Sequence, residues 1–197
     1  MIRLSLALAL ALLTSGCFGG AAPPRFFDPL LPPSTATPQP VGPFVVRLRK
    51  VEATSTLKER IQWRKSDVET GFYESERWAT EPAYVLWTAL RKELYEVRGL
   101  RSGGPRAPYV LDVELSAFEE VLLPEHRVRV RVSVVLATQE ETALRVQTYD
   151  ALRPVESESA EAMARAMGLA LRDVIDALAA GVLESLGDAT QESEDSK

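Results

Sequence analysis

The strongest constraint on the fold of this 197-residue chain is a strict alternation of apolar and polar side chains within residues 126–138. The apolar residues are Val128, Val130, Val132, Val134 and Leu136. The polar residues that alternate with them are Arg127, Arg129, Arg131 and Ser133. Successive side chains of a β-strand point to opposite faces of the sheet, so a period of two predicts a strand with one dry face and one wet face. The chain must therefore build a sheet that is covered on one side.

Further strands are predicted on both sides of this segment. Turn-forming residues separate it from residues 109–121 and 144–152, and the three segments are expected to form an antiparallel meander. Two shorter strand candidates precede the meander, at residues 44–49 and 57–64. Each is rich in apolar side chains that partly alternate with charged ones, which is typical of a half-buried strand.

Two other segments show the period of an amphipathic helix. Residues 78–97 place apolar side chains three or four positions apart, and Pro82 suits a first helical turn. Residues 157–186 repeat the pattern with many alanines, and Ser157 or Ser159 is the expected N-cap. The element order is β-β-α-β-β-β-α. We therefore predict an α+β fold, with a mainly antiparallel sheet and two amphipathic helices packed on one face.

The first 16 residues have the composition of an export signal. Arg3 is followed by an uncharged apolar run that is too short to cross a bilayer, and then by small residues, which predicts a signal peptide that is cleaved. Cys17 comes next, and it is the only cysteine of the chain, so no disulfide framework can form. A cysteine directly after two small residues resembles the bacterial lipobox. The resemblance implies a lipid anchor on Cys17, with acyl chains such as palmitate, and the alternative is a plain secreted protein.

The predicted folded domain covers residues 44–187. Before it, residues 17–43 are rich in proline, which excludes a helix and predicts an extended, lipidated tether. Inside this tether the two adjacent phenylalanines of residues 25–28 are expected to dock on the domain, because they would be costly to leave in water. After the domain, residues 188–197 are polar and acidic, which predicts a disordered tail.

Composition argues against several classes of function. The formal net charge is −5, and it becomes more negative by one when Arg3 leaves with the signal peptide, whereas nucleic-acid binding requires a basic face. The single histidine, His126, has no cysteine cluster or acidic neighbour at ligand spacing, so we expect a surface residue and no zinc site. The adjacent acids Glu119 and Glu120 are expected in solvated positions on opposite faces of a strand end. With no catalytic motif in the chain, we expect neither an enzyme nor a bound cofactor or metal.

One aromatic segment is harder to assign to packing alone. Residues 71–82 carry Phe72, Tyr73, Arg77 and Trp78 on what is predicted to be a turn leading into the first helix. In one interpretation Trp78 holds the helix start against the sheet, with Phe72 or Tyr73 beneath it. In the other, the group forms a contact surface for another subunit, because aromatic residues and arginine are enriched in interface cores. Both interpretations remain open at this point.

This segment resembles the ABC-type transport auxiliary lipoproteins. The shared features are a strand at residues 61–64, a Gly-Phe-Tyr run at 71–73, and an Arg-Trp-Ala run at 77–79 followed by Pro82, which opens an amphipathic helix. The later strands and the closing alanine-rich helix extend the likeness to about residues 26–186. One departure is Trp63, where the family more often has tyrosine.

The resemblance implies a non-enzymatic periplasmic component, anchored by lipid on Cys17, that works with an ABC transporter and an Mce-type protein in moving lipids between membranes. Phe18 follows the lipidated cysteine, and where retention in the inner membrane depends on aspartate at that position, phenylalanine favours the outer membrane. The partners implied are the transporter subunits and the Mce-type protein, and the chain is also a candidate homo-oligomer. Two alternatives stay open: an envelope structural or assembly lipoprotein, and a lipid-binding carrier that acts without an ABC transporter.

Overall fold

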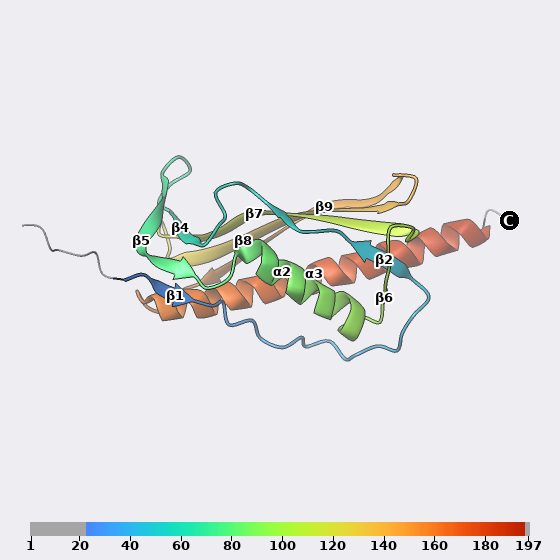
Figure 1. Ribbon diagram of the computed structural model, residues 1–197, viewed down its shortest axis with the longest axis horizontal. Coiled ribbons are helices and arrows are strands. Elements are labelled where there is room, and N and C mark those ends of the chain that lie inside the picture. The colour runs from blue at the N-terminus through green and yellow to red at the C-terminus, as the bar shows by residue number, and fades with distance from the viewer. Residues whose placement is uncertain (1–22, 196–197) are drawn as a thin grey trace, which may run out of the picture.

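The computed structural model describes residues 23–195, with side chains through residue 191 (Figure 1). The predicted signal peptide, Cys17 and the last two residues lie outside the described residues. The elements in chain order are β1 (Arg25–Phe27), β2 (Val45–Leu48), β3 (Glu52–Ala53), β4 (Arg60–Arg64), β5 (Thr70–Trp78), α2 (Pro82–Arg91), the π-helical segment η2 (Lys92–Val97), β6 (Arg101–Ser102), β7 (Tyr109–Val121), β8 (Arg127–Thr138), β9 (Ala143–Pro154) and α3 (Ala160–Asp195).

The sheet is mixed, whereas the sequence predicted a mainly antiparallel one. The meander is confirmed, because β7 pairs antiparallel with β8 and β8 pairs antiparallel with β9. On its other side, however, β7 runs parallel to β2, β3 and β4. Strands connected through a helical crossover lie parallel, and α2 lies between these short strands and β7 in the chain. The antiparallel prediction was therefore wrong where no hairpin fixes the strand direction.

Short strands extend the sheet at both ends. At one end β4 pairs antiparallel with β5, and β5 pairs parallel with β1. At the other end β6 pairs parallel with β2. β1 contains both phenylalanines of the predicted tether, and the main-chain N–H of Ala79 donates to the carbonyl of Phe27 at 2.9 Å. The expected docking is confirmed for the segment and for Phe27, which packs against the core, whereas the side chain of Phe26 is 60% exposed.

The first helix begins four residues later than predicted. Residues 71–78 were interpreted as a turn and a helix start, but they belong to strand β5, and Trp78 is the last residue of that strand. Helix α2 starts at Pro82, which has no N–H to lose from the first turn. A residue before proline is disfavoured in the helical region, and Glu81 accordingly has an extended ψ of 132°. The apolar spacing that begins at Trp78 therefore runs across the boundary between strand β5 and helix α2, and Pro82 sets where the helix begins.

The two helices lie on the same side of the sheet, as predicted (Figure 1). α3 packs along β8 and β9, and α2 packs beside α3. The valines of β8 that alternate with arginines all point into this layer and are almost completely buried. Ser159 caps α3 through a hydrogen bond of 3.2 Å from the N–H of Ala162. The predicted one-sided sheet is thus confirmed by burial.

Helix α3 continues to Asp195, beyond the end that the sequence predicted. Residues 188–195 were expected to belong to a disordered tail because they are acidic and polar. After Gly187 the chain contains alanine, glutamine and glutamate, which are good helix formers, and it contains no proline that would stop the helix. An acidic composition alone therefore does not end a helix that is already formed.

The predicted free tether is mostly part of the fold. Residues 28–43, which we call the strap, run from β1 back along the helical layer to β2 (Figure 1). The N–H groups of Gln39 and Gly42 donate to the carbonyls of Val97 and Gly99, each at 2.8 Å. The backbone of the strap also lies against Gly168 of α3, where any side chain would overlap the carbonyl of Leu30. Prolines keep the strap extended but leave its carbonyls and other N–H groups free to bond.

Candidate partner-binding groove

Trp78, one of the predicted anchor residues, is a core residue. Its side chain is 1% exposed and packs edge-to-face on Phe118 of β7, with ring centroids 5.1 Å apart. Its main-chain N–H donates to the carbonyl of Glu59. The packing interpretation is therefore the correct one for Trp78, and this side chain offers nothing to a partner.

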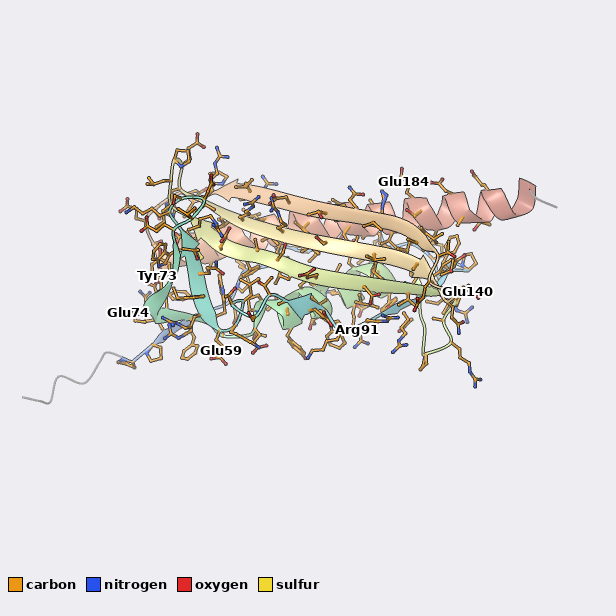
Figure 2. The ribbon with its side chains drawn as sticks, turned by 90° about the horizontal axis from the view of Figure 1, so that it is seen from above. Glu59, Tyr73, Glu74, Arg91, Glu140 and Glu184 are labelled. Carbon is orange, nitrogen blue, oxygen red and sulfur yellow. The ribbon has the colours of Figure 1, made fainter. Side chains whose placement is uncertain are left out.

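The other three predicted residues lie on β5, at one end of the molecule, where Figure 2 labels Tyr73. Phe72 carries the guanidinium of Arg60 over its ring at 5.0 Å. Arg77 turns back on its own strand, with guanidinium donors 2.8–2.9 Å from the carbonyls of Tyr73, Glu74 and Glu76. These side chains are held by local contacts, and the structure does not bring them together with Trp78 into one surface.

Tyr73 belongs instead to a polar cluster with Glu120 and His126. The Tyr73 hydroxyl donates to one oxygen of the Glu120 carboxylate at 2.5 Å, and Nε2 of His126 lies 2.5 Å from the other. Burial, followed by the hydrogen bond to Glu120, raises the pKa of the Tyr73 hydroxyl. His126 was predicted to be a surface residue, and Glu120 was predicted to be solvated. The prediction was wrong for Glu120, which is buried, and His126 is half-buried beside it. The reason is the β7–β8 register, which places Glu120 opposite Val128 and so beside the residue that precedes β8.

Glu119 and Glu120 point to opposite faces of β7, as expected, but both are buried. Glu119 lies on the outer face, where it accepts a hydrogen bond of 2.9 Å from Nε of Arg64. The arginines of β8 extend this ion pair across the neighbouring strands, since Arg129 and Arg131 both donate to Asp150 of β9. At this end of the sheet the outer face therefore carries a network of ion pairs, in which these arginines are paired with Glu119 and Asp150.

Replacing Asp150 by asparagine is expected to cost about 1 kcal/mol at pH 7 and progressively less in acid. Hydrogen bonds, first from Arg129 and then from Arg131, hold the pKa of the Asp150 carboxyl below its ordinary value of 3.8. Because the folded pKa is the lower one, the carboxylate contributes stability above pH 3.8, and this stability is lost as the pH falls through the folded pKa. Urea unfolding of both proteins at pH 7 and at several values below 3.8 measures the difference, and a constant difference would contradict this role.

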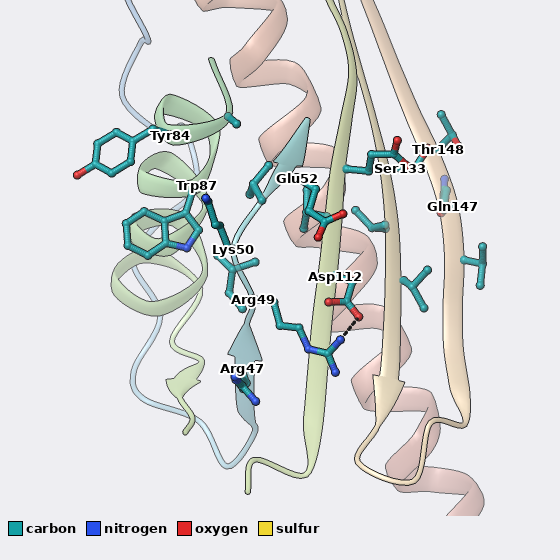
Figure 3. Close-up of a pocket in the computed structure, with 18 of the residues that line it drawn as sticks. Arg47, Arg49, Lys50, Glu52, Tyr84, Trp87, Asp112, Ser133, Gln147 and Thr148 are labelled. Atoms are coloured by element: carbon teal, nitrogen blue, oxygen red, sulfur yellow. Dashed lines mark hydrogen bonds and ion pairs between the residues drawn. The ribbon is translucent and has the colours of Figure 1, made fainter. Parts of the chain in front are cut away.

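A large open groove lies between helix α2 and the outer face of the sheet (Figure 3). It has a volume of about 1220 Å³, which exceeds the roughly 300–1,000 Å³ of most small-molecule pockets. One wall is α2, the other side is the open face of β8 and β9, and the segment from β2 to β3 runs between them (Figure 3). The side chains that line it include Arg47, Arg49, Lys50, Tyr84, Trp87, Asp112, Val135 and Val146.

Helix α2 presents an aromatic pair to this groove. Tyr84 and Trp87 are one helical turn apart, with ring centroids 5.7 Å from each other, and Tyr84 is 59% exposed. They lie beside the stripe of Leu86 and Leu90, which the helix buries. The guanidinium of Arg91 stacks over the Trp87 ring at 4.8 Å. The sequence prediction missed this pair. Two aromatic residues three positions apart, on a helix face outside the buried stripe, are a pattern from which it could have been predicted.

The remaining lining is apolar on the floor and carries charges of both signs around it, because Glu52, Glu81 and Glu114 line the groove as well as the basic residues. Val135 and Val146 are opposite one another in the β8–β9 register and are both exposed. Arg49 donates to Asp112 at 3.2 Å, whereas Arg47 and Lys50 form no ion pair within the part of the chain that the structure describes. The groove can therefore take a ligand that has apolar side chains and carries charges of both signs.

The described residues contain no cluster of three or more potential metal ligands. Between residues 23 and 195 no helix is both long enough and apolar enough to cross a membrane.

A one-sided mixed sheet, backed by a long helix and bordered by a groove, defines the class of this protein as a two-layer α+β domain. Residues 29–179 match the model of the ABC-type transport auxiliary lipoprotein component, and the chain belongs to this family. The family consists of lipoproteins of the bacterial envelope that are associated with ABC-type transport. A search of curated proteins found no match.

Solved structures share the fold. Protein XCC0632 from Xanthomonas campestris is 19% identical, with a TM-score of 0.75, and the match covers 85% of this chain and 99% of that one. An uncharacterized protein is 12% identical, with a TM-score of 0.65, over 82% of this chain and 99% of the other. The hypothetical protein CT253 from Chlamydia trachomatis is 12% identical, with a TM-score of 0.53, over 72% and 96%. At these identities the likeness concerns the fold alone.

Proposed function

We propose that the protein is a lipid-anchored subunit of the cell envelope that binds an ABC transport system with an Mce-type component and assists it in moving lipids between membranes. Family membership supports the association with transport. In this proposal the anchor is the lipid on Cys17, in an outer membrane and facing the periplasm, because phenylalanine and not aspartate follows that cysteine. The protein acts by binding and carries out no chemical step.

The groove beside α2 is the surface that we propose for the partner. The observation that supports this most directly is the aromatic pair of exposed Tyr84 and half-buried Trp87, with Arg91 stacked on the tryptophan. Tryptophan, tyrosine and arginine are the residue types that contribute most to binding energy at protein interfaces. Basic residues (Arg47 and Lys50) and acidic residues (Glu52, Glu81 and Glu114) line the same groove, which favours a segment with charges of both signs beside its apolar side chains.

A carrier that encloses lipid between sheet and helices has less support. The layer between β7–β9 and α3 is filled by fully buried side chains, among them Leu111, Leu115, Leu136, Met163, Met167 and Leu171. An acyl chain could enter only by displacing part of this packed core, and close-packed interiors resist such changes.

Replacing Trp87 by alanine is expected to weaken partner binding by at least about tenfold, because truncating a central interface aromatic commonly costs about 2 kcal/mol or more. The melting temperature should fall much less than on loss of a fully buried tryptophan, because Trp87 is only half-buried at the edge of the core and lies outside the buried stripe of α2. The tagged full-length protein would be purified from mildly crosslinked envelopes in detergent. Mass spectrometry of the recovered ATPase, permease and Mce-type proteins measures binding.

Leu152→Ala is the matched control, because Leu152 is an exposed apolar residue of β9 that does not line the groove. It should recover the same partners as the parent protein. If the parent protein recovers no transporter or Mce-type component, the proposed function is wrong. If the parent recovers them and Trp87→Ala does so equally well, the function stands and the groove is not the docking surface.

A further inference from the structure

The end of the molecule formed by β1, β5 and the turn between β4 and β5 is also the end where the described chain begins (Figure 1). The sequence predicted a tether of residues 17–43 that would hold the domain far from the lipid. Because the strap and β1 are folded onto the domain, the link that remains runs only from Cys17 to Arg25. Eight residues at about 3.4 Å each span at most about 27 Å.

This short link restricts how the domain can lie on a membrane. The long axis runs from the β1–β5 end to the β2–β6 end, where the C-terminal part of α3 also lies (Figure 1). With lipid on Cys17, the β1–β5 end must stay near the bilayer, while the opposite end can point away from it. The groove beside α2 is then left open to the aqueous side.

The same end carries three exposed apolar side chains on separate projections. Phe26 of β1 is 60% exposed, Val68 in the β4–β5 turn is 92% exposed, and Leu123 in the β7–β8 turn is 53% exposed. The two turns are neighbours, because the N–H of Leu122 donates to the carbonyl of Arg64 at 2.8 Å. β1 lies at the other end of β5, with Phe26 opposite Arg77 in the register.

The basic side chains near these tips are paired within the domain, because Arg25 pairs with Glu161, Lys65 with Glu69, and Arg127 with Glu125. Asp67, Glu74 and Glu76 at the same end form no ion pair within residues 23–191, so this surface does not attract anionic lipid. Single apolar side chains on separate tips also do not form the continuous patch that a protein partner would bury. Separate apolar tips suit a soft and uniform partner, such as the headgroup region of a bilayer.

We propose that the β1–β5 end of the domain rests on the membrane that holds the Cys17 lipid, with Val68, Leu123 and Phe26 in contact with its headgroup region. This inference rests on the lipid anchor of the proposed function. The contact is apolar, so it does not depend on anionic lipid and resists salt.

The lipidated full-length protein provides a direct test. Its own cysteine is consumed by the lipid, so a single introduced cysteine is the only free thiol and can carry a polarity-sensitive nitrobenzoxadiazole probe. The test variants are Val68→Cys and Leu123→Cys. The control is Gly104→Cys in the β6–β7 connection, where an added side chain meets open space. Each labelled protein is reconstituted into phosphatidylcholine vesicles that contain spin-labelled phosphatidylcholine, with flotation as a check of anchoring.

We expect blue-shifted emission at residues 68 and 123 that the spin-labelled lipid quenches several-fold more than emission at residue 104, with no change at high salt. Equal quenching at the three positions, or stronger quenching at residue 104, in a protein that floats with the vesicles overturns the orientation and leaves the anchor intact. A protein that does not float overturns both the orientation and the anchoring part of the proposed function. Quenching at residues 68 and 123 that disappears in salt overturns the apolar contact.

Discussion

Replacing Glu93 by alanine is expected to destabilise the folded domain by about 3–5 kcal/mol, which is the usual cost of breaking a buried ion pair by removing one partner. Glu93 is 1% exposed and joins three parts of the chain. Its carboxylate accepts hydrogen bonds from Arg98 at 2.8 Å, from Arg172 of α3 at 2.9 Å and from Ser34 of the strap at 3.1 Å.

The cost arises from the charges that the substitution leaves behind. Arg172 and Arg98 would keep only Asp176 as an acidic partner, and Arg172 is itself buried. Two guanidinium groups would then share one carboxylate in a region that water reaches poorly, so part of their desolvation would no longer be compensated. The strap would also lose the hydrogen bond from Ser34, which is one of its attachments to the helical layer. Faster hydrogen exchange is therefore expected at residues 39 and 42, whose N–H groups form the neighbouring attachments.

The matched control is Glu96→Ala, which removes an exposed carboxylate from the same π-helical segment. It should change the free energy of unfolding by less than about 0.5 kcal/mol. Equilibrium urea unfolding of the chain without its signal peptide, followed by circular dichroism, compares the three proteins. Equal stability of Glu93→Ala and Glu96→Ala would show that the buried network contributes nothing measurable.

Helical periodicity places Glu93 on the buried side of the helix but does not identify its partners. Glu93 comes three residues after Leu90 and seven after Leu86, so on a helix it falls on the same stripe as these two buried leucines. A charged residue on a buried stripe requires a partner of opposite charge inside the domain. No pattern within this segment names that partner, because Arg172 lies 79 residues away.

Local pattern was sufficient where neighbours in sequence are also neighbours in space. The β7–β8–β9 meander follows from alternation and short turns, and the start of α3 follows from Ser159. The parallel strands β2, β3 and β4, and the strap, depend on contacts across long sequence separations that periodicity does not encode. The groove was missed for the same reason, because its walls come from α2, from the β2–β3 segment and from the meander. Its aromatic pair was visible in the sequence, but its position was not.

Replacing Trp78 by alanine is the second substitution with a large expected effect, about 3–5 kcal/mol of lost stability. The indole is completely enclosed, and its edge-to-face contact with Phe118 joins the end of β5 to β7. Removal leaves a cavity at the point where β5 turns into helix α2, and it also removes an aromatic pair worth roughly 0.5–1.5 kcal/mol. Since domains of this size are stable by about 5–15 kcal/mol, one substitution removes a large share of the total.

Trp87→Ala is the control that separates packing from docking, because it removes the same side chain from the groove side of α2. Differential scanning calorimetry should show a strongly lowered melting temperature for Trp78→Ala and a much smaller decrease for Trp87→Ala, which is only half-buried. Co-purification of transport components, with both proteins compared well below their melting temperatures, should show loss only for Trp87→Ala. If Trp78→Ala instead melted like the parent protein and lost the partner, Trp78 would be an interface residue and the buried position described above would be wrong. The interpretation of residues 71–82 as a contact surface for another subunit would then be the correct one, although the packing of Trp78 on Phe118 argues against it.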